Sequence, residues 1–115
     1  MRILFDQGTP LPARHFLSHH AISISAELGW DQPKNGDLLS VAEGAGFELL
    51  LTTDKNLRYQ QNLKERSIAI VVIGYSHWPT VRQHIQRVVA AVDSATPGSY
   101  MEGDIPYAGP RRADV

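Results

Sequence analysis

The sequence predicts an α/β fold with a mostly parallel, twisted sheet of four to five strands. Apolar runs that suit strands alternate along the chain with segments that suit helices, which is the order produced by strand–helix–strand crossovers. Two of the runs, at 48–53 and 68–74, are apolar almost throughout, as in parallel strands covered on both faces. Because such crossovers are right-handed, we expect helices on both faces of the sheet, in three layers.

The first 25 residues are expected to form a strand, a helix and a second strand. The strands are "RILF" at 2–5 and the alternating, β-branched "AISIS" at 21–25. Between them, Thr9 is placed to cap a helix, and Pro10 suits the first turn of that helix. The apolar residues that this helix is expected to turn toward the core are Leu11, Phe16 and Leu17.

The middle of the chain is expected to hold the second helix and the next two strands. After a loop rich in Gly and Pro, Asn35 or Asp37 begins a helix that continues to about Ala45. The residues expected on its inner face are Leu38, Leu39 and Ala42. The run at 48–53, "ELLLTT", is the third strand, and a short polar helix at 57–66 leads to the fourth strand, "IAIVVIG" at 68–74.

The last third of the chain is expected to add one more helix and an edge strand. Apolar residues at helical spacing predict a helix over 79–93, with Pro79 in its first turn. These residues are Val81, Ile85, Val88, Val89 and Val92. The segment "GSYME" at 98–102 suits a short edge strand. The remainder lacks an apolar period, so we expect one domain over 1–102 and a flexible tail over 103–115.

Two of the expected strands end in an aspartate. Asp6 follows the first strand, and Asp54 follows the third, in "LLLTTDKN". Ligands of parallel sheets bind beyond the carboxyl ends of the strands, where the strand order reverses. With the order 2-1-3-4, that reversal lies between the first and third strands, so the two carboxylates are expected side by side. Asp37, in the first turn of the second helix, is the natural third member, and Glu43 is a more distant fallback.

Clustered carboxylates of this kind suggest a metal site. Two carboxylates that lie close together repel each other and stay partly protonated unless a cation joins them. Their hard oxygen atoms suit Mg²⁺ or Mn²⁺. Such an ion can activate water and hold a phosphodiester for in-line attack. Lys55 and Arg58, which flank Asp54, could then hold RNA phosphates.

Each of these residues also has a simpler interpretation. Asp54 can be a helix N-cap, Asp37 can offset a helix dipole, and Asp6 can belong to a turn. Lys55 and Arg58 can be solvated charges at a helix start. The metal hypothesis therefore depends on the topology that brings the three acids together.

Other polar residues give weaker signals. His15 and His19 have the spacing of a zinc pair on a helix, but no third ligand has a clear position, so a solvated helix face is the preferred interpretation. Ser76 and His77 follow the fourth strand and are interpreted as loop residues, because the sequence offers no third partner for Ser–His catalysis. The two tryptophans expected at the edge of the core are Trp30 and Trp78.

The composition excludes several classes of function. The chain has no cysteine, so disulfides, thiolate metal sites and a cysteine nucleophile are excluded. The net charge of -1 gives no global field that attracts nucleic acid, so RNA would need a local patch or a metal. Because no apolar run is long enough to cross a membrane and no signal-peptide pattern is present, we expect a cytoplasmic protein that does not bind membranes.

The order and spacing of these motifs resemble the short PIN-like domains, the family of VapC-type toxin ribonucleases. "RILFDQGTP" is similar to their opening, a strand that ends in Asp. "ELGW…NGDLLSVAEGAGFELLLTTDKN" is similar to their middle, with an Asp that opens a helix and a strand that ends in Thr-x-Asp. The resemblance covers roughly residues 1–75, and the expected helix at 79–93 fits the same order.

The resemblance implies a PIN-like three-layer α/β/α sandwich that binds Mg²⁺ or Mn²⁺ and cleaves RNA. By position, Asp6, Asp37 and Asp54 match the acidic residues of the family that hold the ion. The residues that would steer the ion or the substrate are Thr53, Lys55, Asn56 and Arg58. The resemblance also implies an antitoxin protein as a partner and a homodimer.

The sequence leaves three functional hypotheses open, and two departures from the family pattern bear on the choice among them. Gln7 stands where many relatives have Glu, and Asn56 stands where many have Asp, which weakens metal binding. The first hypothesis is a metal-dependent endoribonuclease, the toxin of a toxin–antitoxin pair. The second is a catalytically weak or inactive PIN-like scaffold that binds protein or RNA. The third, a phospho-receiver-like domain, is disfavoured because Gln7 is not acidic and no Lys follows residue 64.

Overall fold

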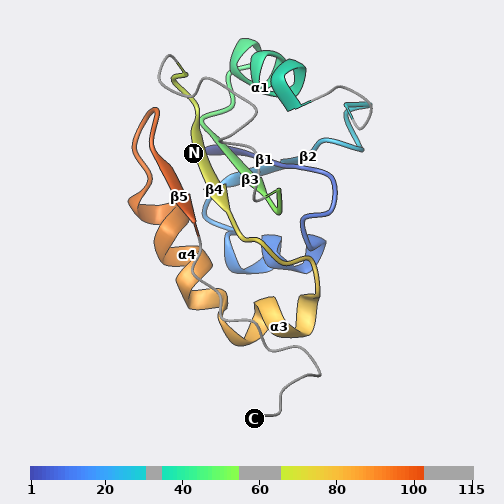
Figure 1. Ribbon diagram of the computed structural model, residues 1–115, viewed down its shortest axis with the longest axis vertical. Helices are drawn as coiled ribbons and strands as arrows, with labels where there is room; N and C mark the ends of the chain where they lie inside the picture. The colour runs from blue at the N-terminus through green and yellow to red at the C-terminus, as the bar shows by residue number, and fades with distance from the viewer. Residues whose placement is uncertain (31–34, 55–65, 103–115) are drawn as a thin grey trace.

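The described part of the chain forms a five-stranded sheet in which all neighbouring strands are parallel (Figure 1). The structure, a computed structural model, describes residues 1–30, 35–54 and 66–102, and only the backbone of 35–37. In spatial order the strands are β2 (Ala21–Ile24), β1 (Arg2–Phe5), β3 (Leu49–Thr52), β4 (Ala69–Val72) and β5 (Tyr100–Glu102). The predicted α/β fold, the strand order 2-1-3-4 and the final edge strand are confirmed.

Helices cover both faces of this sheet. One face packs against α1 (Asn35–Gly44). The other packs against the 3₁₀ helix η1 (Leu11–Phe16), α3 (Trp78–Gln83) and α4 (Ile85–Ser94). Figure 1 shows α1 above the strands, with η1 and α3 below them.

The core consists of two apolar clusters, because successive side chains of a strand point to opposite faces. Strand residues in the cluster with α1 include Leu4, Leu50 and Ile70. Strand residues in the cluster with the other helices include Phe5, Leu51 and Val71. Every residue of β3 and β4 is buried, which explains why these strands read as continuous apolar runs. The inner face of α1 is the one predicted, with Leu38, Leu39 and Ala42 buried.

The first helix differs from its prediction, because η1 is a 3₁₀ helix. Pro10 is its N-cap, and the Thr9 hydroxyl bonds to the Leu51 carbonyl instead of capping a helix. With three residues per turn, Ala13 falls on the same face as Pro10, and both are buried. Leu11 and Phe16, predicted to face the core, are 45% and 38% exposed. Of the three residues predicted to face the core, Leu17 alone is fully buried.

The helix expected over 79–93 is divided into α3 and α4. His84 lies between them with φ -120°, and its N–H donates to the Val81 carbonyl three residues back, which tightens the last turn of α3. Pro79 does lie in the first turn, as predicted. The apolar spacing survives the break, since Val81, Ile85 and Val88 are buried.

Two further expectations fall on segments that are not described. The polar helix predicted at 57–66 lies, apart from Arg66, outside the described residues, and so does the tail at 103–115. Within the described segments, every helix is too short or too polar to cross a membrane.

Candidate functional site

Asp6 and Thr52 meet where β1 and β3 end. Phe5 is in register with Leu51, so Asp6 lies level with Thr52 at the carboxyl edge of the sheet. The Thr52 hydroxyl donates a hydrogen bond of 2.8 Å to Oδ2 of Asp6. The backbone N–H of Gln7 donates one of 2.7 Å to Oδ1 of the same carboxylate. Both carboxylate oxygens are therefore held in place at the point where the strand order reverses.

Asp54 joins this group through the same threonine. Its backbone N–H donates to Thr52 Oγ1 at 3.1 Å, so one hydroxyl accepts from Asp54 and donates to Asp6. Thr52 is fully buried, which restricts the movement of both partners. The charge of Asp54 is close enough to raise the pKa of Asp6. The two strand-end aspartates thus lie together, as the strand order predicted.

The carboxyl group of Asp6 resists ionisation. Burial raises the pKa of Asp6 above its ordinary value, and the negative charge of Asp54 adds to that rise. The hydrogen bonds from Thr52 and Gln7 lower the pKa but do not offset the burial. A positive charge beside both aspartates would favour the ionised form of Asp6.

The loop after β1 folds back over the end of β3. The Thr9 N–H donates to the Asp6 carbonyl at 3.1 Å, and the Thr9 hydroxyl donates to the Leu51 carbonyl at 3.0 Å. Gly8 has φ +90°, and a Cβ at this position would lie 3.3 Å from Thr53 Oγ1. Thr53 therefore lies against the loop that follows Asp6. Its role in steering an ion or substrate stays a prediction.

The other predicted site residues are described in part or not at all. Asp37 lies in the first turn of α1, as predicted, but its side chain is outside the described part of the structure. Lys55, Asn56 and Arg58 also lie outside the described residues. Their contribution to the site stays a prediction.

Glu43 cannot serve as the fallback acid, because its carboxylate is used elsewhere. It accepts hydrogen bonds from the Arg66 guanidinium at 2.9 Å, the Ser67 N–H at 2.7 Å and the Ile68 N–H at 3.2 Å. These residues precede β4, so Glu43 lies at the amino edge of the sheet. Burial acts to raise the pKa of Glu43, but the hydrogen bonds, that of Arg66 foremost, hold it below its ordinary value.

His15 and His19 do not form the pair that their spacing suggested. His15 lies in η1, which ends at Phe16, so no common helix face joins the two residues. His19 instead lies beside His20, and both contact Asp93 of α4. His77 contacts the Thr80 hydroxyl at 3.0 Å, which agrees with its interpretation as a loop residue.

Both tryptophans lie at the edge of the core, as predicted. Trp30 packs edge-on against Phe47, with ring centroids 5.9 Å apart, and Trp78 lies 6.0 Å from Phe16.

Sequence reasoning missed the roles of two threonines: Thr52 bonds to the Asp6 carboxylate, and Thr9 ties the loop after β1 to the end of β3. The sequence pattern predicts an apolar strand at Thr52 and a helix cap at Thr9. The sequence carries one signal for the role of Thr52. It is the one polar residue of β3, "LLLT", a strand that is buried at every position. A buried hydroxyl requires a hydrogen-bonding partner, and the nearest candidates at the end of that strand are acids.

Comparison of the chain with protein-family models, with curated proteins and with solved structures found no match. The resemblance to PIN-like domains therefore remains a prediction that rests on the sequence motifs.

Proposed function

We propose that the protein is a PIN-like, metal-dependent endoribonuclease whose Asp6, Asp37 and Asp54 hold Mg²⁺ or Mn²⁺. The observation that carries the proposal is the convergence of Asp6 and Asp54 on the buried hydroxyl of Thr52. Two acids at the reversal point of a parallel sheet are where a ligand is expected. The order of the motifs in the sequence adds the family resemblance.

The described residues fit a hard divalent cation. The site offers carboxylate oxygens. Burial, with a smaller contribution from the charge of Asp54, raises the pKa of Asp6, and a bound cation would favour the ionised form of that carboxyl group. When bound, such an ion lowers the pKa of water and neutralises charge on a phosphodiester. Thr52 and the Gln7 N–H would keep the Asp6 oxygens oriented, and the Gly8 loop would keep Thr53 beside them.

The proposal extends to partners and location. RNA is the substrate, and Lys55, Asn56 and Arg58 contact it or the ion. An antitoxin protein covers the site in a toxin–antitoxin pair, the chain forms a homodimer, and the complex is cytoplasmic. The support for this extension is the sequence resemblance, together with the absence, among the described residues, of a helix able to cross a membrane.

The direct test is cleavage of a mixed single-stranded RNA pool by purified protein in Mn²⁺. We expect cleavage that requires both the metal and Asp6, with Asp6→Asn slower by about 10²–10³-fold, the scale of losing one preorganised electrostatic partner. Glu48→Gln is the matched control, because the Glu48 carboxylate bonds to the Arg2 N–H at the opposite edge of the sheet. Mass spectrometry of the preparation should first exclude a co-purified inhibitor.

The alternative is a PIN-like scaffold that binds RNA or protein without cutting. Gln7 favours it, since its exposed side chain adds no negative charge beside Asp6. In that case wild type and Asp6→Asn would both fail to cleave the RNA pool, and both would bind Mn²⁺ equally weakly. Cleavage by the wild type that Asp6→Asn abolishes would exclude this alternative.

A further inference from the structure

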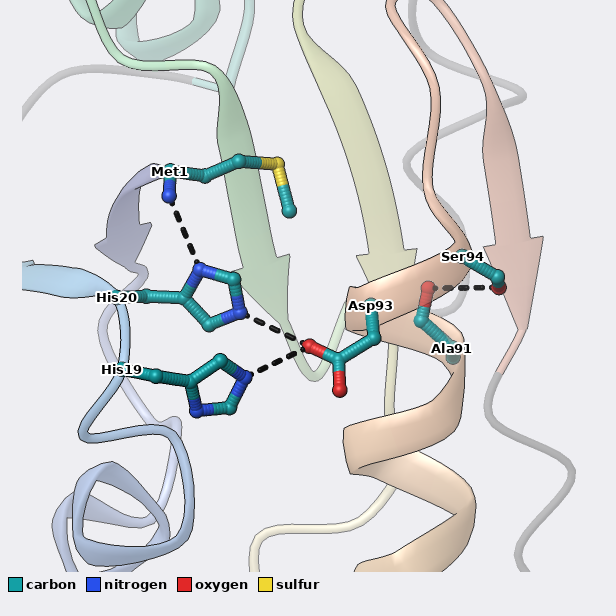
Figure 2. A network of polar contacts seen from close by, with 6 residues as sticks. All are labelled: Met1, His19, His20, Ala91, Asp93 and Ser94. Carbon is teal, nitrogen blue, oxygen red and sulfur yellow. Dashed lines mark hydrogen bonds and ion pairs between the residues drawn. The ribbon is translucent and has the colours of Figure 1, made fainter.

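Three side chains that could hold a metal ion, His19, His20 and Asp93, gather at the amino edge of the sheet, whereas the paired aspartates lie at its carboxyl edge. Figure 2 shows this second group. His19 and His20 directly precede β2, and Asp93 lies in the last turn of α4. Nε2 of His19 lies 3.0 Å from Asp93 Oδ1, and Nε2 of His20 lies 2.9 Å from the same oxygen. The three potential ligand atoms all lie within 4.8 Å of one another.

We propose that His19, His20 and Asp93 form a site for a divalent transition-metal ion of the zinc class. Two imidazole nitrogens and one carboxylate oxygen are a donor set that zinc sites use, with a fourth position left for water or another ligand. Chain segments more than 70 residues apart supply these donors, so their convergence is a product of the fold. The site is independent of the proposed nuclease activity.

The environment of the three residues suits an ion that arrives from solvent. The side chains of His19 and Asp93 are 54% and 45% exposed, whereas that of His20 is 9% exposed. His20 is therefore the fixed ligand, and the other two can adjust around an ion.

The two imidazoles are already arranged as neighbours. Their ring centroids lie 4.1 Å apart, and Figure 2 shows both Nε2 atoms directed at Asp93. On the far side of His20, Nδ1 lies 3.0 Å from the amino group of Met1, a contact that fixes the orientation of the ring. To bind a metal through Nε2, each imidazole must give up its proton on that nitrogen and carry one on Nδ1. For His20, the Nε2 proton leaves to solvent, the Met1 ammonium transfers a proton to Nδ1, and the neutral Met1 amine then accepts a hydrogen bond from Nδ1–H.

An ion at this position would connect two parts of the fold. Its ligands would come from the segment before β2, which carries His19 and His20, and from the last turn of α4, which carries Asp93. Since an ion that binds only the folded chain stabilises that chain, the thermal midpoint should rise with added Zn²⁺.

The test is metal binding by the untagged full chain, because a polyhistidine tag would itself bind Zn²⁺. Co²⁺ absorption bands in the visible range report imidazole and carboxylate ligation, and competition with a chelator gives the Zn²⁺ affinity. We expect one ion per chain and a higher thermal midpoint with stoichiometric Zn²⁺. Asp93→Asn should weaken Zn²⁺ binding by at least about tenfold, the minimum for loss of even an outer-shell partner.

Three further variants make the result specific. His19→Gln replaces a largely exposed ring, so it should fold and should also weaken binding at least about tenfold. His15→Ala, an exposed histidine of η1, should bind Zn²⁺ as the wild type does. Asp6→Asn should also keep Zn²⁺ binding, whatever its effect on RNA cleavage. The proposal is wrong if Asp93→Asn and His19→Gln bind Zn²⁺ as the wild type does, or if Asp6→Asn removes the binding.

Discussion

At the scale of single residues, the buried hydroxyl of Thr52 determines how the two strand-end aspartates lie. It donates to the Asp6 carboxylate and accepts from the Asp54 backbone, so it fixes the distance between the two strand ends. The two aspartates carry the negative charge of the candidate site. The hydrogen bonds of Thr52 hold them in the fixed positions that a metal site requires.

Thr52→Val tests this role, because it removes the hydroxyl and keeps the shape of the side chain. We expect the free energy of unfolding at neutral pH to fall by about 1–3 kcal/mol, since a buried acceptor and donor both lose their partner. The pKa of Asp6 should rise further, because the Thr52 hydrogen bond lowers it. Denaturant unfolding and a carboxyl-carbon NMR titration measure the two effects. An unchanged pKa of Asp6 would show that Thr52 does not hold its carboxylate.

The pKa of Asp6 also predicts a pH dependence of stability in metal-free buffer. The ordinary pKa is 3.8 and that of the folded state is higher, so in this window the folded state binds more protons than the unfolded chain. The contribution of Asp6 to stability is therefore full below pH 3.8 and is lost as the pH rises through the folded-state pKa. Asp6→Asn should gain stability relative to the wild type over this rise. The measurement is urea unfolding at several pH values, and a stability difference that is independent of pH would contradict the account.

At the scale of secondary-structure elements, Glu43 connects α1 to the start of β4. Its carboxylate accepts from the Arg66 guanidinium, the Ser67 N–H and hydroxyl and the Ile68 N–H. Because these donors precede β4, the contact fixes where α1 lies over the sheet. The first turn of α1, which carries Asp37, depends on the same placement.

Glu43→Gln should therefore destabilise the fold. We expect a loss of about 1–3 kcal/mol at neutral pH, because the amide presents a donor where the carboxylate accepted. The pKa of Glu43 lies below its ordinary 4.5 in the folded state, so the stabilisation is present above pH 4.5 and is lost as the pH falls through the folded-state pKa. Ser40→Ala is the control, since it loses one exposed hydrogen bond to Arg66 and should cost less than about 0.5 kcal/mol. Equal losses in the two variants would contradict this role of Glu43.

The elements differ in how well the sequence predicted them. The buried strands β3 and β4 were predictable because a parallel strand covered on both faces is apolar throughout. The 3₁₀ geometry of η1 was not, because its apolar residues suit either helix type and tertiary contacts decide between them. The break between α3 and α4 at His84 was also not predictable, because the apolar spacing continues through it from Val81 to Ile85.

At the scale of the whole molecule, the two faces of the sheet carry most of the stability. Leu50, in the central strand β3, is 1% exposed against α1, whereas Leu11 is 45% exposed. We expect Leu50→Ala to lower the free energy of unfolding by about 2–5 kcal/mol through lost burial and a cavity. Leu11→Ala, the same substitution at an exposed position, should cost no more than about 0.5 kcal/mol. Denaturant unfolding measures the free energy of unfolding of both variants. Equal losses would mean that Leu50 does not lie in the core.

The strand order explains which part of the candidate site was predictable. Asp6 and Asp54 each follow a strand, so the order 2-1-3-4 was sufficient to bring them together. The contact of His20 with Asp93 joins residues 73 apart in sequence. It depends on where the last turn of α4 ends, and no local pattern in the sequence fixes that position.

The most direct test of the metal site at the paired aspartates is Mn²⁺ binding by electron paramagnetic resonance, with every protein carrying Asp93→Asn so that the second proposed metal site does not contribute. It needs no RNA substrate. We expect Asp6→Asn and Asp54→Asn each to weaken Mn²⁺ binding by at least about tenfold, whereas Glu48→Gln should bind Mn²⁺ as strongly as the protein without these changes. If all four proteins bind Mn²⁺ equally, the carboxyl edge of the sheet is not a metal site, and the nuclease proposal fails with it.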